Sequence, residues 1–138
     1  MRFEERGRTA IATGRSNMGI HIVPTTETYR VHDGAKVTLR ITIGEAQIGA
    51  WVVAWSSNNV VARGAEPELV DLGFGRDLRG RTLQVVVTAQ RGGAGTDRFS
   101  RTLAFDGGAE GSREVLDHWE QGDSDDDTVV FTTMIGFQ

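Results

Sequence analysis

The chain has 138 residues, of which 38% are hydrophobic and 25% charged, and its formal net charge is −4. This length and composition are typical of one folded domain, so we expect a single domain over residues 1–138. The negative charge disfavours a nucleic-acid partner, because the phosphate backbone attracts basic surfaces, and the absence of cysteine excludes disulfides and thiolate metal sites.

Charged residues dominate segment 1–8, and no apolar run follows them, which is unlike a signal peptide. No apolar stretch approaches the roughly 20 residues of a membrane-spanning helix. We therefore expect a cytoplasmic protein without a membrane span.

In chain order, short alternating segments at 9–13, 19–24 and 27–32 are the first candidate strands. The clearest strand is 36–43, where every second side chain is apolar and one face is therefore buried. Asp33-Gly34 stands between 27–32 and 36–43 and is a strong signal for a two-residue hairpin turn.

Segments 50–55 and 83–89 are apolar on both faces and so depart from this alternation. A strand buried on both faces needs cover on both sides. The cover is either a segment of the same chain or a second subunit. In the second case the interface would include Trp51, Val53, Trp55 and Val86.

The remaining strands are predicted at 60–63, 68–72, 81–90, 98–105 and 128–137. Ser57-Asn58-Asn59 predicts a turn before 60–63, because asparagine tolerates a left-handed backbone. The glycine-rich segment 92–96 predicts a hairpin loop. In 98–105 the inward side chains are Phe99, Leu103 and Phe105, and Arg101 interrupts their row.

Segment 114–121 is the best candidate for a helix, although it fits a strand equally well. About eight to nine short strands with regular turns predict an all-β fold. We expect a two-sheet antiparallel β-sandwich of the immunoglobulin-like or C2-like kind, with at most one short helix.

No residue cluster indicates an enzyme. The histidines His21, His32 and His118 are scattered and have no metal-ligand spacing. Ser16 lies near glycines but lacks the glycine two residues later that a nucleophile elbow requires. We therefore predict no catalytic residues and no enzymatic activity.

The acidic run 123–127 is the sharpest local feature of the sequence. Oxygen-rich loops bind calcium, and Asp123, Asp125 and Asp127 match the first three ligands of an EF-hand loop. The match ends there, because Thr128 replaces the required glycine and Met134 replaces the bidentate glutamate. A solvated acidic loop is favoured over a calcium site, and no other cofactor is expected.

Trp51 and Trp55 share one face of a strand, about 13 Å apart at the usual rise per residue. That spacing would suit stacking on a sugar chain, whereas their apolar neighbours favour burial in the core. The function predicted from the sequence is a non-enzymatic module that acts by protein–protein contact as a homo-oligomer. The alternative is a ligand-binding module for sugar or calcium.

Overall fold

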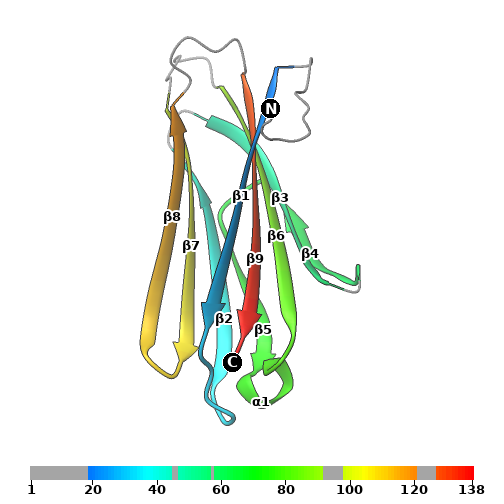
Figure 1. The fold of residues 1–138 in the computed structure, drawn as a ribbon, viewed down its shortest axis with the longest axis vertical. Helices are drawn as coiled ribbons and strands as arrows, with labels where there is room; N and C mark the ends of the chain where they lie inside the picture. Colours follow the sequence, from blue (N-terminus) through cyan, green and yellow to red (C-terminus); the bar gives the residue numbers. More distant parts are fainter. Residues whose placement is uncertain (1–18, 45–46, 57, 92–97, 121–126) are drawn as a thin grey trace.

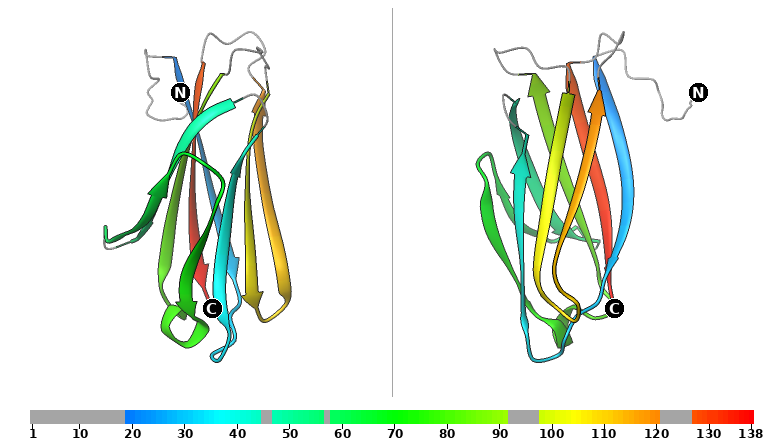
Figure 2. Two further views of the ribbon diagram at one scale, coloured as in Figure 1. Left: turned by 180° about the vertical axis from the view of Figure 1, so that it is seen from behind. Right: turned by 90° about the vertical axis from the view of Figure 1, so that its left-hand side faces the viewer.

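The computed structural model describes residues 19–44, 47–56, 58–91, 98–120 and 127–138. In this part of the chain, nine strands and one helical turn form a two-layer β-sandwich (Figure 1). The two sheets form the two layers of the sandwich (Figure 2), and they enclose a common hydrophobic core. The all-β two-sheet sandwich with at most one short helix that the sequence predicts is therefore confirmed, but one strand pair is parallel and not antiparallel as expected.

One sheet has five strands in the order β1 (Ile20–Tyr29), β9 (Thr128–Phe137), β6 (Thr82–Arg91), β3 (Gln47–Trp55) and β4 (Val60–Gly64). The other has four strands in the order β5 (Glu68–Phe74), β2 (Lys36–Ile43), β7 (Arg98–Gly108) and β8 (Gly111–Glu120). The helical turn α1 (Gly75–Leu78) follows β5 at one end of the sandwich (Figure 1).

The pairing of β1 with β9 is parallel, from Ile20 opposite Thr128 to Tyr29 opposite Phe137. The other pairings between the named strands are antiparallel, as expected. A parallel pair needs a long connection, and here the whole of β2 to β8 lies between the two partners. The first and last described strands of the chain thus lie side by side.

The prediction that the strands flanking Asp33-Gly34, and those flanking segment 92–96, pair as hairpins is wrong. Asp33 and Gly34 do lie in a turn, closed by a 3.3 Å hydrogen bond from the Ala35 amide to the His32 carbonyl. However, β1 and β2 belong to different sheets, and so do β6 and β7. Turn residues set only the local backbone direction, whereas side chains on distant strands decide which strands pair. Segment 92–97 itself lies outside the described residues.

The connection between β3 and β4 agrees with the sequence. Asn58 has a φ of 72°, which is the left-handed conformation expected of an asparagine in this turn. Its amide donates a 2.8 Å hydrogen bond to the carbonyl of Trp55. The two strands then pair directly as an antiparallel hairpin.

Segment 114–121 is a strand as far as it is described, not a helix. It belongs to β8, which pairs with β7. Val115 is 8% exposed and its neighbour Leu116 is 56% exposed, which is the alternation of a sheet and not of a helix. Only one face of β8 packs against the core, so most polar residues of this segment remain on the surface.

The core lies between the sheets and is built from the inward side chains that alternation predicted. In β2, β7 and β9 the fully buried apolar side chains include Val37, Leu39, Ile41, Phe99, Leu103, Val129, Phe131 and Ile135. Burial of these side chains is the main stabilising contribution to the fold, because each removes apolar surface from water.

Candidate functional site

Strand β3 divides its two apolar faces between the core and the surface. Trp51 and Val53 are 1% and 0% exposed, and Trp55 is partly buried against the core. Of the residues predicted to form an interface, Trp51 and Val53 therefore lie in the interior and are not available to a partner. This corrects the sequence interpretation, which assigned the face of the strand that carries Trp51, Val53 and Trp55 to the interface with a second subunit. The side chains that point outward from β3 are Ala50, Val52 and Ala54.

Val86 does lie on the outside, on the neighbouring strand β6. It stands opposite Val52 on one side and opposite Thr132 of β9 on the other. Thr132 in turn stands opposite Pro24 of β1. These residues form one cross-strand row on the outer surface of the five-stranded sheet, because directly opposite residues share a face.

Two further cross-strand rows of outward side chains lie on either side of this central row. Together they form a surface that we call the uncharged face, since it contains no ionisable side chain. Its residues are Ile22, Pro24 and Thr26 of β1, Val130, Thr132 and Met134 of β9, Gln84, Val86 and Thr88 of β6, and Ala50, Val52 and Ala54 of β3. The sequence signal for it was the doubly apolar character of β3 and β6. The sequence did not show which face of β3 is buried. In the structure the buried face is the one that carries the larger side chains, Trp51 and Trp55.

The outer surface of the four-stranded sheet is chemically different. Arg40 of β2 stands opposite Leu69 of β5 and Ala104 of β7, and Ala104 stands opposite Glu114 of β8. The outward positions of this sheet include the charged residues Arg40, Asp71, Asp106, Glu114 and Glu120. Such a surface is normal for contact with water, so the two outer surfaces of the sandwich contrast sharply.

The edges of both sheets carry features that hinder the addition of a further strand. Strand β1 has Pro24 in its middle, and β4 has only five residues, a register shift against β3 and the exposed Arg63. Strand β5 exposes Glu68 and Asp71. Strand β8 carries Arg113, Glu114, Asp117 and Glu120. Proline, charges, irregularities and short length are the usual means by which edge strands avoid pairing with other chains.

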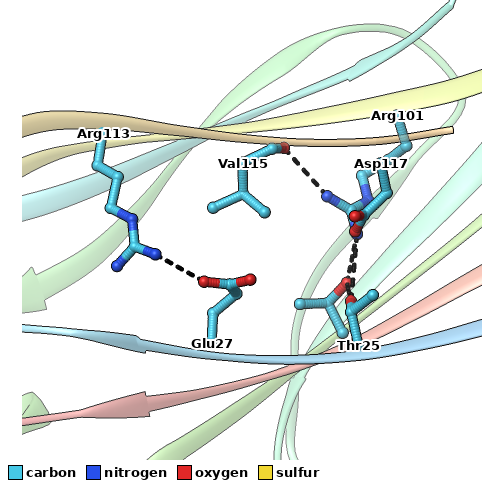
Figure 3. Close-up of polar contacts among 7 residues, drawn as sticks. Thr25, Glu27, Arg101, Arg113, Val115 and Asp117 are labelled. Carbon is cyan, nitrogen blue, oxygen red and sulfur yellow. Dashed lines mark hydrogen bonds and ion pairs between the residues drawn. The ribbon is translucent and has the colours of Figure 1, made fainter.

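Arg101 of β7 is the most unusual buried group. Its side chain has no exposed surface, and its guanidinium donates to the Val115 carbonyl at 3.1 Å and to the Asp117 carboxylate (Figure 3). It also donates to Thr133 Oγ1 at 2.5 Å, and that hydroxyl lies 2.8 Å from Thr25 Oγ1. These contacts join β7 and β8 of one sheet to β1 and β9 of the other.

Burial lowers the pKa of the Arg101 guanidinium, and the charge of Asp117 opposes that effect. The Nε atom of Arg101 has no hydrogen-bond partner in the described structure. Beside this cluster, Arg113 forms a second ion pair with Glu27 at 2.6 Å (Figure 3). The sequence indicated only that Arg101 interrupts an apolar row, and its partners on three other strands had no local signal.

The proposed calcium ligands are only partly described. Asp123 and Asp125 lie outside the described residues. Asp127 is exposed immediately before β9, and its carboxylate accepts a 3.3 Å hydrogen bond from Thr128 Oγ1. Among the residues that the structure describes, no group of three histidine, aspartate or glutamate side chains is placed to hold a metal ion.

The tryptophans do not form an open platform for a sugar. The Trp51 indole is buried, and its N–H donates a 2.9 Å hydrogen bond to the Glu66 carbonyl. The ring of Trp55 is covered by the Arg81 guanidinium, whose carbon lies 3.8 Å from the ring centroid. Trp119 of β8 stacks on His21, with 4.3 Å between the ring centroids.

A polar hollow of about 250 Å³ lies beside the β7–β8 turn. Its walls are already paired with one another: Arg30 contacts Glu110 at 3.2 Å, and the Tyr29 hydroxyl donates to the Gly111 carbonyl at 3.1 Å. Arg113 also donates to the Thr28 carbonyl at 2.6 Å. The hollow therefore offers little unsatisfied hydrogen-bonding capacity to a ligand.

Comparison of the chain with protein-family models, with curated proteins and with solved structures finds no match. No helix in the described part of the chain is long and apolar enough to cross a membrane.

Proposed function

We propose that this chain is a non-enzymatic interaction module that acts by protein–protein contact and self-associates through the uncharged face. The observation that carries the proposal is the difference between the two outer surfaces. Four adjacent strands of the five-stranded sheet present no ionisable side chain outward in their described positions, whereas the four-stranded sheet presents arginine, aspartate and glutamate.

A surface of this kind is suited to association because depletion of charge is the compositional mark of the centre of protein interfaces. Apolar side chains such as Val52, Val86 and Val130 gain free energy when water is removed from them. The edges of both sheets are protected as described above. Contact between faces is therefore favoured over the addition of a strand to an edge.

The proposal is tested by light scattering and sedimentation of the full chain over a range of concentrations. We expect a concentration-dependent oligomer that Val86→Arg weakens, because the substitution buries a charge at the centre of the contact. Thr102→Arg, on the outer surface of the four-stranded sheet, is the matched control and should associate like the unsubstituted chain. Melting curves establish that both variants are folded. A monomer at every concentration would overturn the proposal.

A further inference from the structure

Near the middle of the five-stranded sheet, the outward side chains of its three central strands follow a pattern that is chemically similar in both directions along the strand. Strand β3 presents Ala50, Val52 and Ala54, which is symmetric about Val52. Strand β9 presents two larger apolar residues on either side of a threonine: Val130, Thr132 and Met134. Strand β6 presents polar residues on either side of a valine: Thr82, Gln84, Val86, Thr88 and Gln90.

The centres of these three patterns coincide in space. Val52 is opposite Val86, and Val86 is opposite Thr132. The strands are thus in register so that the centres of these outward patterns form one row across the sheet. A chemically symmetric surface about such a row is self-complementary to a copy of itself that is rotated by a half-turn about the row.

We propose that the occupant of the uncharged face is a second copy of this chain, related by a two-fold axis that runs along the Val52–Val86–Thr132 row. This inference rests on the proposed function and assigns the geometry of the contact. Strands of the two copies then run antiparallel, and each residue of the central row meets its own equivalent. Val130 of one copy lies over Met134 of the other, and Thr88 lies over Gln84.

This arrangement places like chemistry together throughout the centre. Val130 and Met134 of β9 pack against each other across the contact. The Gln84 amide and the Thr88 hydroxyl of β6 face each other where they can exchange hydrogen bonds. Ala50 and Ala54 meet at β3 and allow close approach. The edge strand β1 does not share the symmetry, since its outward residues are Ile22, Pro24 and Thr26. The right-handed twist of both sheets carries the edges away from such a contact.

Charge selects the face through which a second copy can approach. Each chain carries a net charge of −4, so two copies repel one another over most of their surfaces. The uncharged face is where they approach with few like charges together, since the central row meets a charged side chain only at its end, where the exposed Arg63 of the edge strand β4 stands opposite Val52. Four strands about 4.8 Å apart and up to about ten residues long, at about 3.4 Å per residue, make a face of roughly 600 Å² per copy. This is below the ~800 Å² per partner of a standard interface, so a reversible dimer is expected.

Cysteine cross-linking tests the axis, because the chain contains no cysteine of its own. Facing sheets lie about 10 Å apart, so Val86→Cys places two thiols within reach of a short bismaleimide across the axis. Ala50→Cys alone places the Cα atoms of its two cysteines roughly 17 Å apart, because four residues of strand (about 14 Å) separate it from its position over Ala54 and the sheets lie about 10 Å apart. The same holds for Ala54→Cys alone.

We therefore expect covalent dimers from Val86→Cys alone, little product from Ala50→Cys or Ala54→Cys alone, and at least fivefold more from an equal mixture of those two. Thr102→Cys on the four-stranded sheet is the control for random collision and should give little product. Melting curves establish that each variant is folded.

The outcomes separate the two proposals. If light scattering shows a dimer but Ala50→Cys alone links as well as the mixture does, the axis is wrong and self-association through this face stands. If the chain is dimeric and Thr102→Cys links best, both the axis and the choice of face are wrong. If the chain is monomeric and the Val86→Cys thiol reacts slowly with maleimide, another segment of the same chain covers the face, and both proposals are overturned.

Discussion

Arg101 and Asp117 form an ion pair in which the guanidinium is completely buried while the carboxylate remains 23% exposed. The two partners therefore depend on each other unequally. If the arginine is removed, Asp117 can be hydrated from the surface. If the carboxylate is removed, the arginine keeps a buried positive charge whose remaining partners are neutral oxygens of Val115, Thr25 and Thr133.

We predict that Asp117→Ala destabilises the fold by about 3 kcal/mol, since removal of one partner leaves a buried charge uncompensated. Arg101→Met should cost much less, because it removes the charge and keeps a long apolar side chain. Urea unfolding measures both free energies. Glu27→Gln is the control, because its partner Arg113 is 45% exposed and such a pair contributes about 0–1 kcal/mol. Equal losses from Asp117→Ala and Arg101→Met would contradict the unequal dependence.

We predict that alkaline pH destabilises the fold through Tyr29. Burial raises the pKa of its phenol above the usual value of 10.0. Between about pH 10 and the folded pKa, the unfolded chain binds fewer protons than the folded one, so stability falls as pH rises. Tyr29 is the only tyrosine, so the absorbance of its phenolate reports this titration directly.

Tyr29→Phe serves as the comparison for that experiment. It should reduce the loss of stability above pH 10. At neutral pH it should cost about 1 kcal/mol, because the hydrogen bond to the Gly111 carbonyl is lost. A phenolate that forms at the pKa of free tyrosine, or an alkaline loss that is unchanged in Tyr29→Phe, would refute the prediction.

We predict that opposite charges at Val86 restore a dimer that like charges disrupt. Val86→Arg and Val86→Glu should each raise the dissociation constant at least tenfold, because a residue on the axis meets its own equivalent and like charges repel. An equal mixture of the two variants should form a heterodimer, measured by light scattering. Thr102→Arg and Thr102→Glu, alone and mixed, should have no effect. A mixture that stays monomeric would contradict the placement of Val86 on the two-fold axis.

We predict that calcium leaves the melting temperature of the chain unchanged, because a solvated acidic loop is favoured over a calcium site. Calcium bound only to the folded state would raise the melting temperature. The measurement is a melting curve with millimolar calcium and with a chelator. Asp125→Asn is the informative variant, because Asp125 is the middle member of the alternating aspartates. A calcium-dependent rise that Asp125→Asn abolishes would instead establish a metal site in the acidic run.

By itself, the sequence determined most of the strands and most of the core, while the candidate strand 9–13 lies outside the described residues. Alternation has a period of two residues and is local, so the inward side chains of β2, β7 and β9 were readable without knowledge of their partners. The turn at Asn58 was readable for the same reason, because the left-handed backbone is a property of one residue.

Only the tertiary structure decided which strands share a sheet, that β1 runs parallel to β9, and which face of β3 is buried. It also brought Asp117, Thr25 and Thr133 to Arg101. Each of these depends on contacts between residues far apart in the chain, for which no local period exists. The row of Val52, Val86 and Thr132 belongs to this class, because three separate strands must be in register before their outward patterns coincide.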